Sequence, residues 1–196
     1  MEQDTRIRLL DAATPLFAQK GLGGVSIRQL ADAAAVNSAL ISYYFSGKEG
    51  LYTAVLENQF SSVSESLPSL SDLPADMTAR LSCYAELILA AHRRHPYLLR
   101  LWHNELANPT PCFESVVKKH IQRFYNFLHA CISSGSTSGE FKSDIDPAYA
   151  ALSLVGILNF YFIAKPFATA FFPERQDHDV RYIEQALHIY LNGIRR

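Results

Sequence analysis

The sequence predicts an all-α protein, with a small N-terminal domain over residues 1–50 and a larger helical bundle over residues 51–196. Apolar residues recur at helical spacing along the chain, and no stretch alternates apolar with polar residues between turn signals, as strands do. Capping-box patterns mark two helix starts near the N-terminus. Hydrophobic residues make up 48% of the 196 residues, so the chain can bury a full core.

The first predicted helix ends at Lys20 and Gly21, a basic last turn followed by a glycine. Its apolar stripe consists of Ile7, Leu10, Ala13 and Phe17. Ser26 and Gln29 form a capping box that begins a second, short helix. The expected inner face of this second helix consists of Ile27, Leu30, Ala31 and Ala34.

A third helix is expected over residues 38–44, with Asn37 as its cap and with Ile41 and Phe45 pointing inward. Ser46 and Glu49 repeat the capping-box pattern and predict the start of a fourth helix. That helix should fade in the serine-rich segment SSVSESLPSLSDLP, which is expected to be a loop.

Five further helices are expected in the bundle. They run from about 74 to 94, from 98 to the proline at 109, from 110 to the segment SSGSTSG, from 147 to about 164, and from about 179 to the end. The last one places apolar residues at spacings of three and four, which suits packing against another helix. These residues are Val180, Ile183, Leu187, Tyr190 and Ile194. Together with the very apolar helix before it, this seam suggests a helical dimer interface.

Charge and cysteine content narrow the function classes. The net charge is −1, and residues 1–50 carry five Lys or Arg and five Asp or Glu, so nucleic-acid binding must rest on local placement. Three scattered cysteines form neither a disulfide framework nor a metal motif, which fits a reducing cytoplasm. The start MEQDTRIRLL lacks the features of an export signal. Residues 148–164 are too short and too polar to predict a membrane span.

Two short helices that are joined by a tight turn and packed against a preceding helix form a helix-turn-helix, whose second helix enters the DNA major groove. Serine and tyrosine hydroxyls can bond phosphate, and leucine can contact a thymine methyl. Lys48 would strengthen a phosphate site at a helix N-terminus, and Ser26 with Arg28 offers a similar clamp. The expected DNA contacts are Ser26, Arg28, Ser38, Ala39, Leu40, Ser42, Tyr43, Tyr44 and Lys48. The competing interpretation of Tyr43, Tyr44 and Lys48 is an aromatic plug with a solvated lysine.

The first 51 residues or so resemble the tetracycline-repressor (TetR) family of bacterial transcription regulators. The resemblance is carried by RLLDAATPLFAQKG, SIRQLADAAAVNSALISYYF and SGKEGL, with departures at Ala35, Ala39 and Ser42 that concern base reading. HPYLLRLWHNELANPTPCFESVV and GEFKSDIDPAYAALSLVGILNFYF resemble one C-terminal subgroup. The resemblance implies a homodimeric, ligand-responsive regulator, usually a repressor, that binds a double-stranded operator. We expect no cofactor.

The C-terminal helices also carry aromatic and polar residues of the kind that line small-molecule pockets. These candidate ligand residues are Trp102, Phe124, Tyr125, His129, Asn159 and Tyr161. Ordinary core packing explains most of them equally well.

Two rival classes remain open, a helical protein-interaction adaptor and a metal-binding helical enzyme. The metal candidates are His92, His95, His103 and Glu105, but the break at His95-Pro96 disrupts their geometry. Neither Cys112 nor Cys131 lies in a recognisable nucleophile motif. We therefore expect no metal and no enzyme activity.

Overall fold

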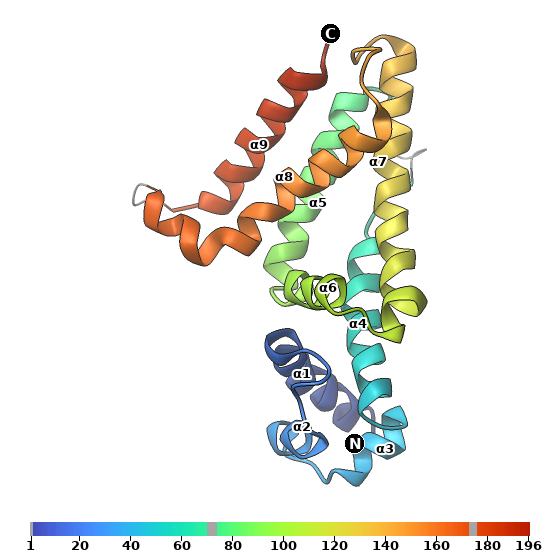
Figure 1. Ribbon diagram of the computed structural model, residues 1–196, viewed down its shortest axis with the longest axis vertical. Coiled ribbons are helices and arrows are strands. Elements are labelled where there is room, and N and C mark those ends of the chain that lie inside the picture. Colours follow the sequence, from blue (N-terminus) through green and yellow to red (C-terminus); the bar gives the residue numbers. More distant parts are fainter. Residues whose placement is uncertain (1, 70–73, 173–175) are drawn as a thin grey trace. The chain divides into compact units, whose positions relative to one another are not determined.

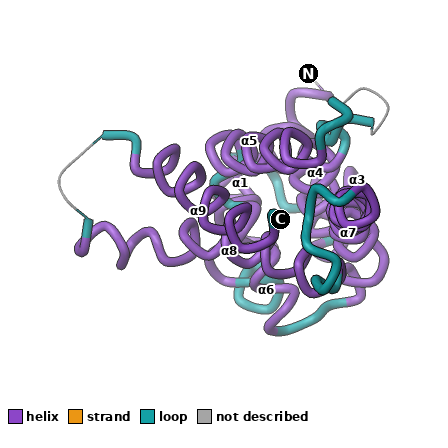
Figure 2. Tube along the Cα trace, turned by 90° about the horizontal axis from the view of Figure 1, so that it is seen from above, coloured by secondary structure: helices purple, strands orange, loops and turns teal. Residues whose placement is uncertain are grey.

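Helices make up nearly all of the regular structure in the computed structural model, which describes residues 2–69, 74–172 and 176–196 (Figure 1). The helices are α1 (Glu2–Lys20), α2 (Ile27–Ala34), α3 (Ala39–Phe45), α4 (Lys48–Ser64), α5 (Met77–Arg94), α6 (Leu98–Ala107), α7 (Lys118–Ser138), α8 (Pro147–Ala168) and α9 (His178–Ile194). A π-helical turn, Phe113–Val117, leads into α7, and a 3₁₀ turn, Thr169–Phe171, follows α8. Figure 2 shows only helix and loop along the described chain, so the predicted all-α class is confirmed.

Contacts along the chain define two compact units. The first contains Met1–Ser62 with Tyr97–His120, and the second contains Val63–Pro96 with Ile121–Arg196. The first unit therefore includes α1 to α3, most of α4, and α6. The predicted division separates a DNA-binding domain, residues 1–50, from a ligand-binding and dimerisation domain, residues 51–196. This functional division stays a prediction.

The core of the first unit is built on one face of α1. Leu9, Leu10, Ala13 and Phe17 are buried, as are Leu30, Ala31 and Ala34 of α2. Two residues expected in these stripes are exposed instead: Ile7 is 49% exposed and Ile27 is 40% exposed. Side chains in a helix lean toward its N-terminus. Ile27 is the first residue of α2, so its side chain extends past the N-terminal end of the helix and away from the buried residues of α2. Ile7 lies two residues before Leu9, the first buried residue in the described part of α1.

One of the two predicted capping boxes is confirmed. The Gln29 backbone N–H donates to Ser26 Oγ at 3.2 Å, and the Ser26 N–H donates to Gln29 Oε1 at 2.9 Å. The box predicted at Ser46 and Glu49 is wrong, because α4 begins at Lys48 and Ser46 lies before the cap position. Ser46 instead ends α3: it adopts left-handed dihedrals, with φ of 60°, and its N–H donates to the Ser42 carbonyl at 3.0 Å.

The segment SSGSTSG ends the helix that contains it, but only at its last residue, Gly139. The chain is helical from Pro111, and α7 runs to Ser138 before Gly139, with φ of +81°, turns the chain. A hydroxyl in this segment bonds within the helix, since Thr137 Oγ1 donates to the Ser133 carbonyl at 2.9 Å. Gly135 is required for packing, because a Cβ there would lie 2.3 Å from Phe141 Cδ2.

The second unit packs α5, α8 and α9 around a core that includes Leu81, Leu154 and Ile183. The apolar seam of α9 faces this core, with Ile183, Tyr190 and Ile194 buried in the same chain. The buried seam residues therefore pack within the chain. The expectation that this seam and the apolar helix before it form a dimer interface stays a prediction.

Helix α8 continues past the end predicted at residue 164. Pro166 lies in its last turn, where a missing N–H costs only one hydrogen bond near the helix end. With 22 residues, α8 is long and apolar enough to cross a membrane by length and composition alone, and a third of its most apolar window (33%) is buried. A core helix passes the same test, so this feature is weak evidence for a membrane span.

Candidate nucleic-acid interface

Helix α3 is anchored on one side and open on the other. Ile41 and Phe45 are buried, as the sequence predicts, and they fix the helix to the core. Among the candidate DNA contacts, Ser26, Arg28, Ser38, Ala39, Ser42 and Tyr43 are exposed, and Leu40, Tyr44 and Lys48 are half-buried. Tyr43 is 70% exposed, with its ring 4.9 Å from the Tyr44 ring in edge contact. All nine candidates lie in α2 or α3, at the residue just before one of these helices, or at the first residue of α4.

The turn between α2 and α3 sets the direction of α3. Ala35 adopts left-handed dihedrals, φ 52° and ψ 50°, and the Val36 N–H donates to the Ala31 carbonyl at 3.0 Å. This conformation costs a non-glycine residue roughly 1 kcal/mol, which explains why glycine suits the position. Asn37 Oδ1 accepts from the Ala39 N–H at 2.9 Å, the capping role predicted for it.

The turn between α3 and α4 brings Lys48 beside α3. Gly47 has φ of +116°, and the Leu51 N–H donates to its carbonyl at 3.1 Å. Gly50 lies against the α3 backbone, since a Cβ at this position would be 1.7 Å from the Phe45 carbonyl oxygen. Lys48 is the first residue of α4, where unpaired N–H groups and the helix dipole favour an anion.

Two arginines of α1, which were not among the predicted site residues, support the helix-turn-helix. Arg8 Nη2 donates to the carbonyls of Ala34 at 2.7 Å and Ala35 at 3.0 Å, which ties α1 to the end of α2. Arg6 lies over the Phe45 ring, 5.2 Å from its centroid. No local pattern marks these residues, because their partners lie far along the chain.

Two polar candidates are already engaged within the protein. The Ser26 hydroxyl serves the α2 cap, and Arg28 Nε lies 3.8 Å from Asp32 Oδ2 on an exposed surface. That ion pair is weak, because exposed pairs contribute little and are screened by salt. A phosphate could replace Asp32 as the partner of Arg28.

A buried carboxylate connects α4 with α6 in the same unit. Glu105 is fully buried, and Tyr52 O–H donates to its Oε1 at 2.7 Å. The Thr110 N–H donates to Glu105 Oε2 at 3.2 Å, and Thr110 Oγ1 lies 3.0 Å from each oxygen. Burial raises the pKa of Tyr52, and the hydrogen bond to Glu105 raises it further, so the phenol stays a donor.

The neighbouring residue, Asn104, holds the end of α1. Its Nδ2 lies 3.1 Å from the carbonyl oxygens of both Phe17 and Ala18 and donates to them. These carbonyls lie in the last turn of α1, and the Phe17 carbonyl also accepts from the Gly21 N–H at 2.8 Å. Helix α6 therefore contacts α4 through Glu105 and α1 through Asn104.

Two of the residues considered as metal ligands, His92 and Glu105, are hydrogen-bonded to other side chains. His92 Nε2 lies 2.8 Å from Asn159 Oδ1, while Asn159 Nδ2 donates to the Val155 carbonyl at 2.8 Å. Burial lowers the pKa of His92, against the opposing effects of Asn159 and Asp179. Within residues 2–69, 74–172 and 176–196, no group of three or more His, Cys, Asp or Glu side chains could hold a metal ion.

The candidate ligand residues fall in both units. Trp102 belongs to the first, and its buried indole Nε1 has no hydrogen-bond partner in the described part of the chain. In the second, the rings of Tyr125 and His129 lie 5.8 Å apart, and Phe124 packs against Tyr84. Asn159 and Tyr161 are buried, and Tyr161 O–H donates to Asp179 Oδ1 at 3.0 Å.

Comparison with known proteins supplies a family. A family model described as "Bacterial regulatory proteins, tetR family" matches residues 9–55. A second family model, described as "Tetracyclin repressor-like, C-terminal domain", matches residues 74–162. The chain is 27% identical over 143 residues to the probable HTH-type transcriptional regulator YttP of Bacillus subtilis, covering 72% of this chain and 69% of YttP. It is 27% identical over 161 residues to the HTH-type transcriptional repressor NicS of Pseudomonas putida, covering 80% and 75%.

Solved structures share the fold. The ketosteroid transcriptional regulator KstR2 of Mycobacterium tuberculosis aligns with a TM-score of 0.79 at 20% identity, covering 97% of this chain and 95% of that one. AibR, solved in complex with isovaleryl coenzyme A and operator DNA, aligns with a TM-score of 0.77 at 18% identity, covering 94% and 97%.

Proposed function

Because this chain belongs to the tetracycline-repressor family of bacterial regulatory proteins, we propose that it represses transcription as a homodimer bound to a pseudo-palindromic operator. In this proposal a small-molecule effector controls the affinity for DNA, and the protein acts in the cytoplasm. A two-fold dimer would present two copies of α3 about one DNA turn apart, roughly 34 to 36 Å. The proposal includes no catalytic step.

The observation that carries the proposal is the open face of α3 next to the start of α4. Ser42 and Tyr43 project from a helix that Ile41 and Phe45 fix to the core, so their contacts need little reorganisation. Lys48 and the first N–H groups of α4 would hold a phosphate beside α3. The nine candidate contacts named from the sequence remain the proposed DNA-binding residues.

Replacement of Lys48 tests the proposed phosphate contact. We expect Lys48→Ala to weaken binding to all DNA sequences and to lower the slope of log affinity against log salt by about one for each copy of the chain. The measurement is a salt titration on a DNA fragment that the wild-type protein enriches from a genomic library. Lys20→Ala removes an exposed cation elsewhere in the unit and should leave the slope unchanged. Equal slopes for wild type and Lys48→Ala would remove Lys48 from the interface.

The exposed face of α8 supports the homodimer. Tyr149, Leu152, Phe160 and Ile163 are large apolar side chains open to solvent, and Ile189 of α9 is exposed as well. A Cβ at Gly156, between them, would meet no atom within 4 Å, so a second helix could approach closely at that point. The two-fold contact proposed here uses α8 of both copies.

A charge on this face should separate the copies. Phe160 is 63% exposed, so Phe160→Glu leaves the core intact but buries a carboxylate in the proposed contact. We expect the mass measured by light scattering to fall from twice 22.0 kDa to 22.0 kDa, and operator affinity to fall with it. Leu106→Glu, on exposed apolar surface of α6, is the control and should remain dimeric. A dimeric Phe160→Glu variant would place the interface elsewhere.

The unpaired indole of Trp102 supports a small-molecule effector. A buried N–H without an acceptor is costly, and a ligand oxygen could satisfy it. AibR, similar in fold, was solved with a coenzyme A thioester and operator DNA together. The six residues named from the sequence stay the proposed ligand contacts. Effector binding would shift α4, change the spacing of the two α3 helices and so reduce DNA affinity by linkage.

A further inference from the structure

The sequence of α3 contains no residue type that reads a base through two hydrogen bonds. Helix α3, Ala39–Phe45, has the sequence ALISYYF, without Lys, Arg, His, Asn, Gln, Asp or Glu. In the DNA major groove, Arg or Lys pairs with guanine, Asn or Gln pairs with adenine, and a carboxylate accepts from cytosine. None of these pairs is open to α3. Thymine is left, because its C5 methyl group is read by apolar contact.

Aliphatic side chains occupy the part of α3 that enters the groove. Ile41 and Phe45 are buried, and at about 100° per residue the direction opposite to this pair falls between Ala39 and Tyr43. Ala39 is exposed, and the next residue, Leu40, is half-buried. In a helix-turn-helix, the N-terminal residues of the second helix contact the base edges. Ala39 and Leu40 are the first two residues of α3, so methyl groups are what this turn presents to the bases.

The hydroxyl side chains of α3 add hydrogen bonds but little base selection. Ser42 is exposed, and its hydroxyl is both donor and acceptor, so it can bond to more than one base. Tyr43 is 70% exposed, and its ring is in edge contact with Tyr44, with the centroids 4.9 Å apart. A phenol hydroxyl on so long a side chain suits the phosphate backbone, and contacts to phosphate carry no sequence information.

The two amide side chains between residues 26 and 45 already cap helices. Gln29 Oε1 accepts from the Ser26 N–H, and Asn37 Oδ1 accepts from the Ala39 N–H, both at 2.9 Å. An amide reads adenine with its oxygen and its nitrogen facing the base together. The caps turn both oxygens toward the protein backbone instead, so neither amide is oriented to supply that pair.

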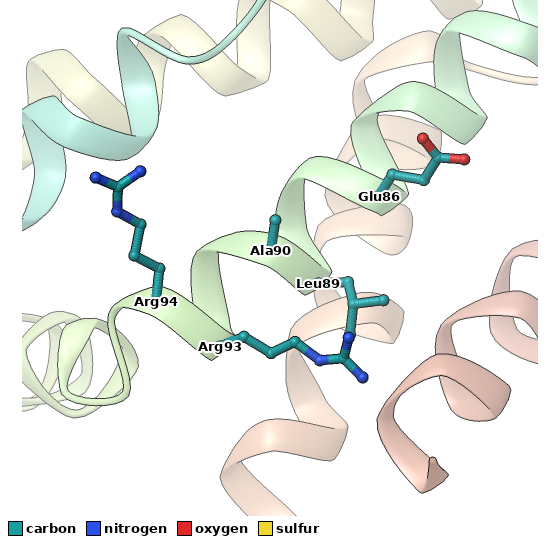
Figure 3. A pocket seen from close by; sticks show the side chains of 5 residues that line it. All are labelled: Glu86, Leu89, Ala90, Arg93 and Arg94. Carbon is teal, nitrogen blue, oxygen red and sulfur yellow. The ribbon is translucent and has the colours of Figure 1, made fainter.

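The two cations among the candidate DNA contacts are placed for the phosphate backbone. Lys48 is the first residue of α4, and Arg28 lies on α2, the helix that crosses the backbone in a helix-turn-helix. Two other exposed arginines, Arg93 and Arg94, line an open hollow on α5 and extend to opposite sides of Ala90 (Figure 3). They belong to the second unit and do not form one anion site. Base selection is therefore left to α3.

We propose that α3 selects its operator through thymine methyl groups, which Ala39 and Leu40 contact in the major groove, so that T·A pairs occupy the half-site positions under the first turn of α3. This inference rests on the proposed DNA-binding function and names the base that the site takes. Burial of one methyl-sized apolar group contributes about fourfold in affinity. Loss of the same methyl group from both half-sites should therefore cost about tenfold or more.

Replacement of thymine by uracil tests the proposal, because uracil lacks only the C5 methyl group. The DNA is the operator that the full-length wild-type protein selects from a genomic library, with uracil placed at one thymine position of both half-sites at a time. We expect one or two positions at which uracil lowers the affinity about tenfold or more. Uracil at the other positions should bind as thymine does.

Two variants connect these methyl groups to residues. The ratio of thymine to uracil affinity should fall close to one at one sensitive position in Ala39→Gly, and at the same or the other position in Leu40→Ala. The ratio is taken within each variant, so a general loss of stability or of DNA affinity cancels. Ala107→Gly, at an exposed alanine of α6, is the matched control and should keep the wild-type ratio.

Three results would overturn the thymine assignment and leave the proposed function standing. They are a selected operator without thymine in its half-sites, specific binding that no uracil replacement weakens, and a uracil effect that persists unchanged in both variants. A selection that yields no sequence-specific site would instead overturn the proposed function, and this inference with it.

Discussion

Gly50→Ala is expected to unfold the helix-turn-helix or displace α3, although alanine is the better helix former. Gly50 lies in the first turn of α4, where alanine would gain about 1 kcal/mol in helix propensity. The new Cβ would lie 1.7 Å from the Phe45 carbonyl oxygen and 2.9 Å from its carbon, both of them backbone atoms. No side-chain rotation relieves that contact, so α3 and α4 must separate. We expect a loss of about 3 kcal/mol or more.

Two measurements check this prediction. The thermal unfolding midpoint should fall on the order of 10 °C, and operator affinity should fall at least about tenfold because Lys48 and α3 move apart. Gly23→Ala is the matched control, because a Cβ at Gly23 meets nothing within 4 Å and its backbone is not left-handed. If Gly50→Ala bound and melted like wild type, the turn from Phe45 to Gly50 would have a different conformation from the one described.

Glu105→Leu is expected to be the most damaging change at a buried polar residue. Removal of the carboxylate leaves the Tyr52 hydroxyl and both donors of Thr110 without their acceptor. Each buried donor left unpaired costs about 1 to 3 kcal/mol, so the variant should lose roughly 3 to 5 kcal/mol in free energy of unfolding. Denaturant unfolding at equilibrium measures the loss.

A double-mutant cycle separates the network from simple packing. Tyr52→Phe removes one of the three donors, so it should cost less in the Glu105→Leu protein than in the wild type. The difference, expected to be about 1 kcal/mol or more, is the coupling between the two side chains. Additive losses would mean that Tyr52 and Glu105 do not act together, and that the link from α6 to α4 is not carried by this bond.

Residues that act through near neighbours could be predicted from the sequence. The Ser26–Gln29 box, the Asn37 cap and the inward pair Ile41 and Phe45 all depend on contacts within one helical turn. The resemblance to the TetR family identified the N-terminal segment as a DNA-binding domain. Composition alone could not do so, because a net charge of −1 does not indicate nucleic-acid binding. Lys48 was identified because its position at a helix start carries a physical meaning of its own.

Residues whose partners are distant in the chain could not be predicted. Arg8 supports the end of α2, and Asn104 holds the end of α1, yet both look like ordinary surface residues in the sequence. Glu105 was considered only as a metal candidate, because spacing along the sequence does not indicate its partners, the buried Tyr52 and the half-buried Thr110. Tertiary contacts also explain why the α9 seam faces inward and why a glycine in SSGSTSG continues a helix.

The most direct test of the account is a selection of genomic DNA fragments on the purified full-length protein, with the enriched sequences compared and the best one titrated with salt. We expect one pseudo-palindromic site, with half-sites centred about one DNA turn apart, bound at least about 10³-fold more tightly than unrelated DNA at physiological salt. Selection that enriches no common site, or equal binding of all fragments, would contradict the claim that α3 reads an operator.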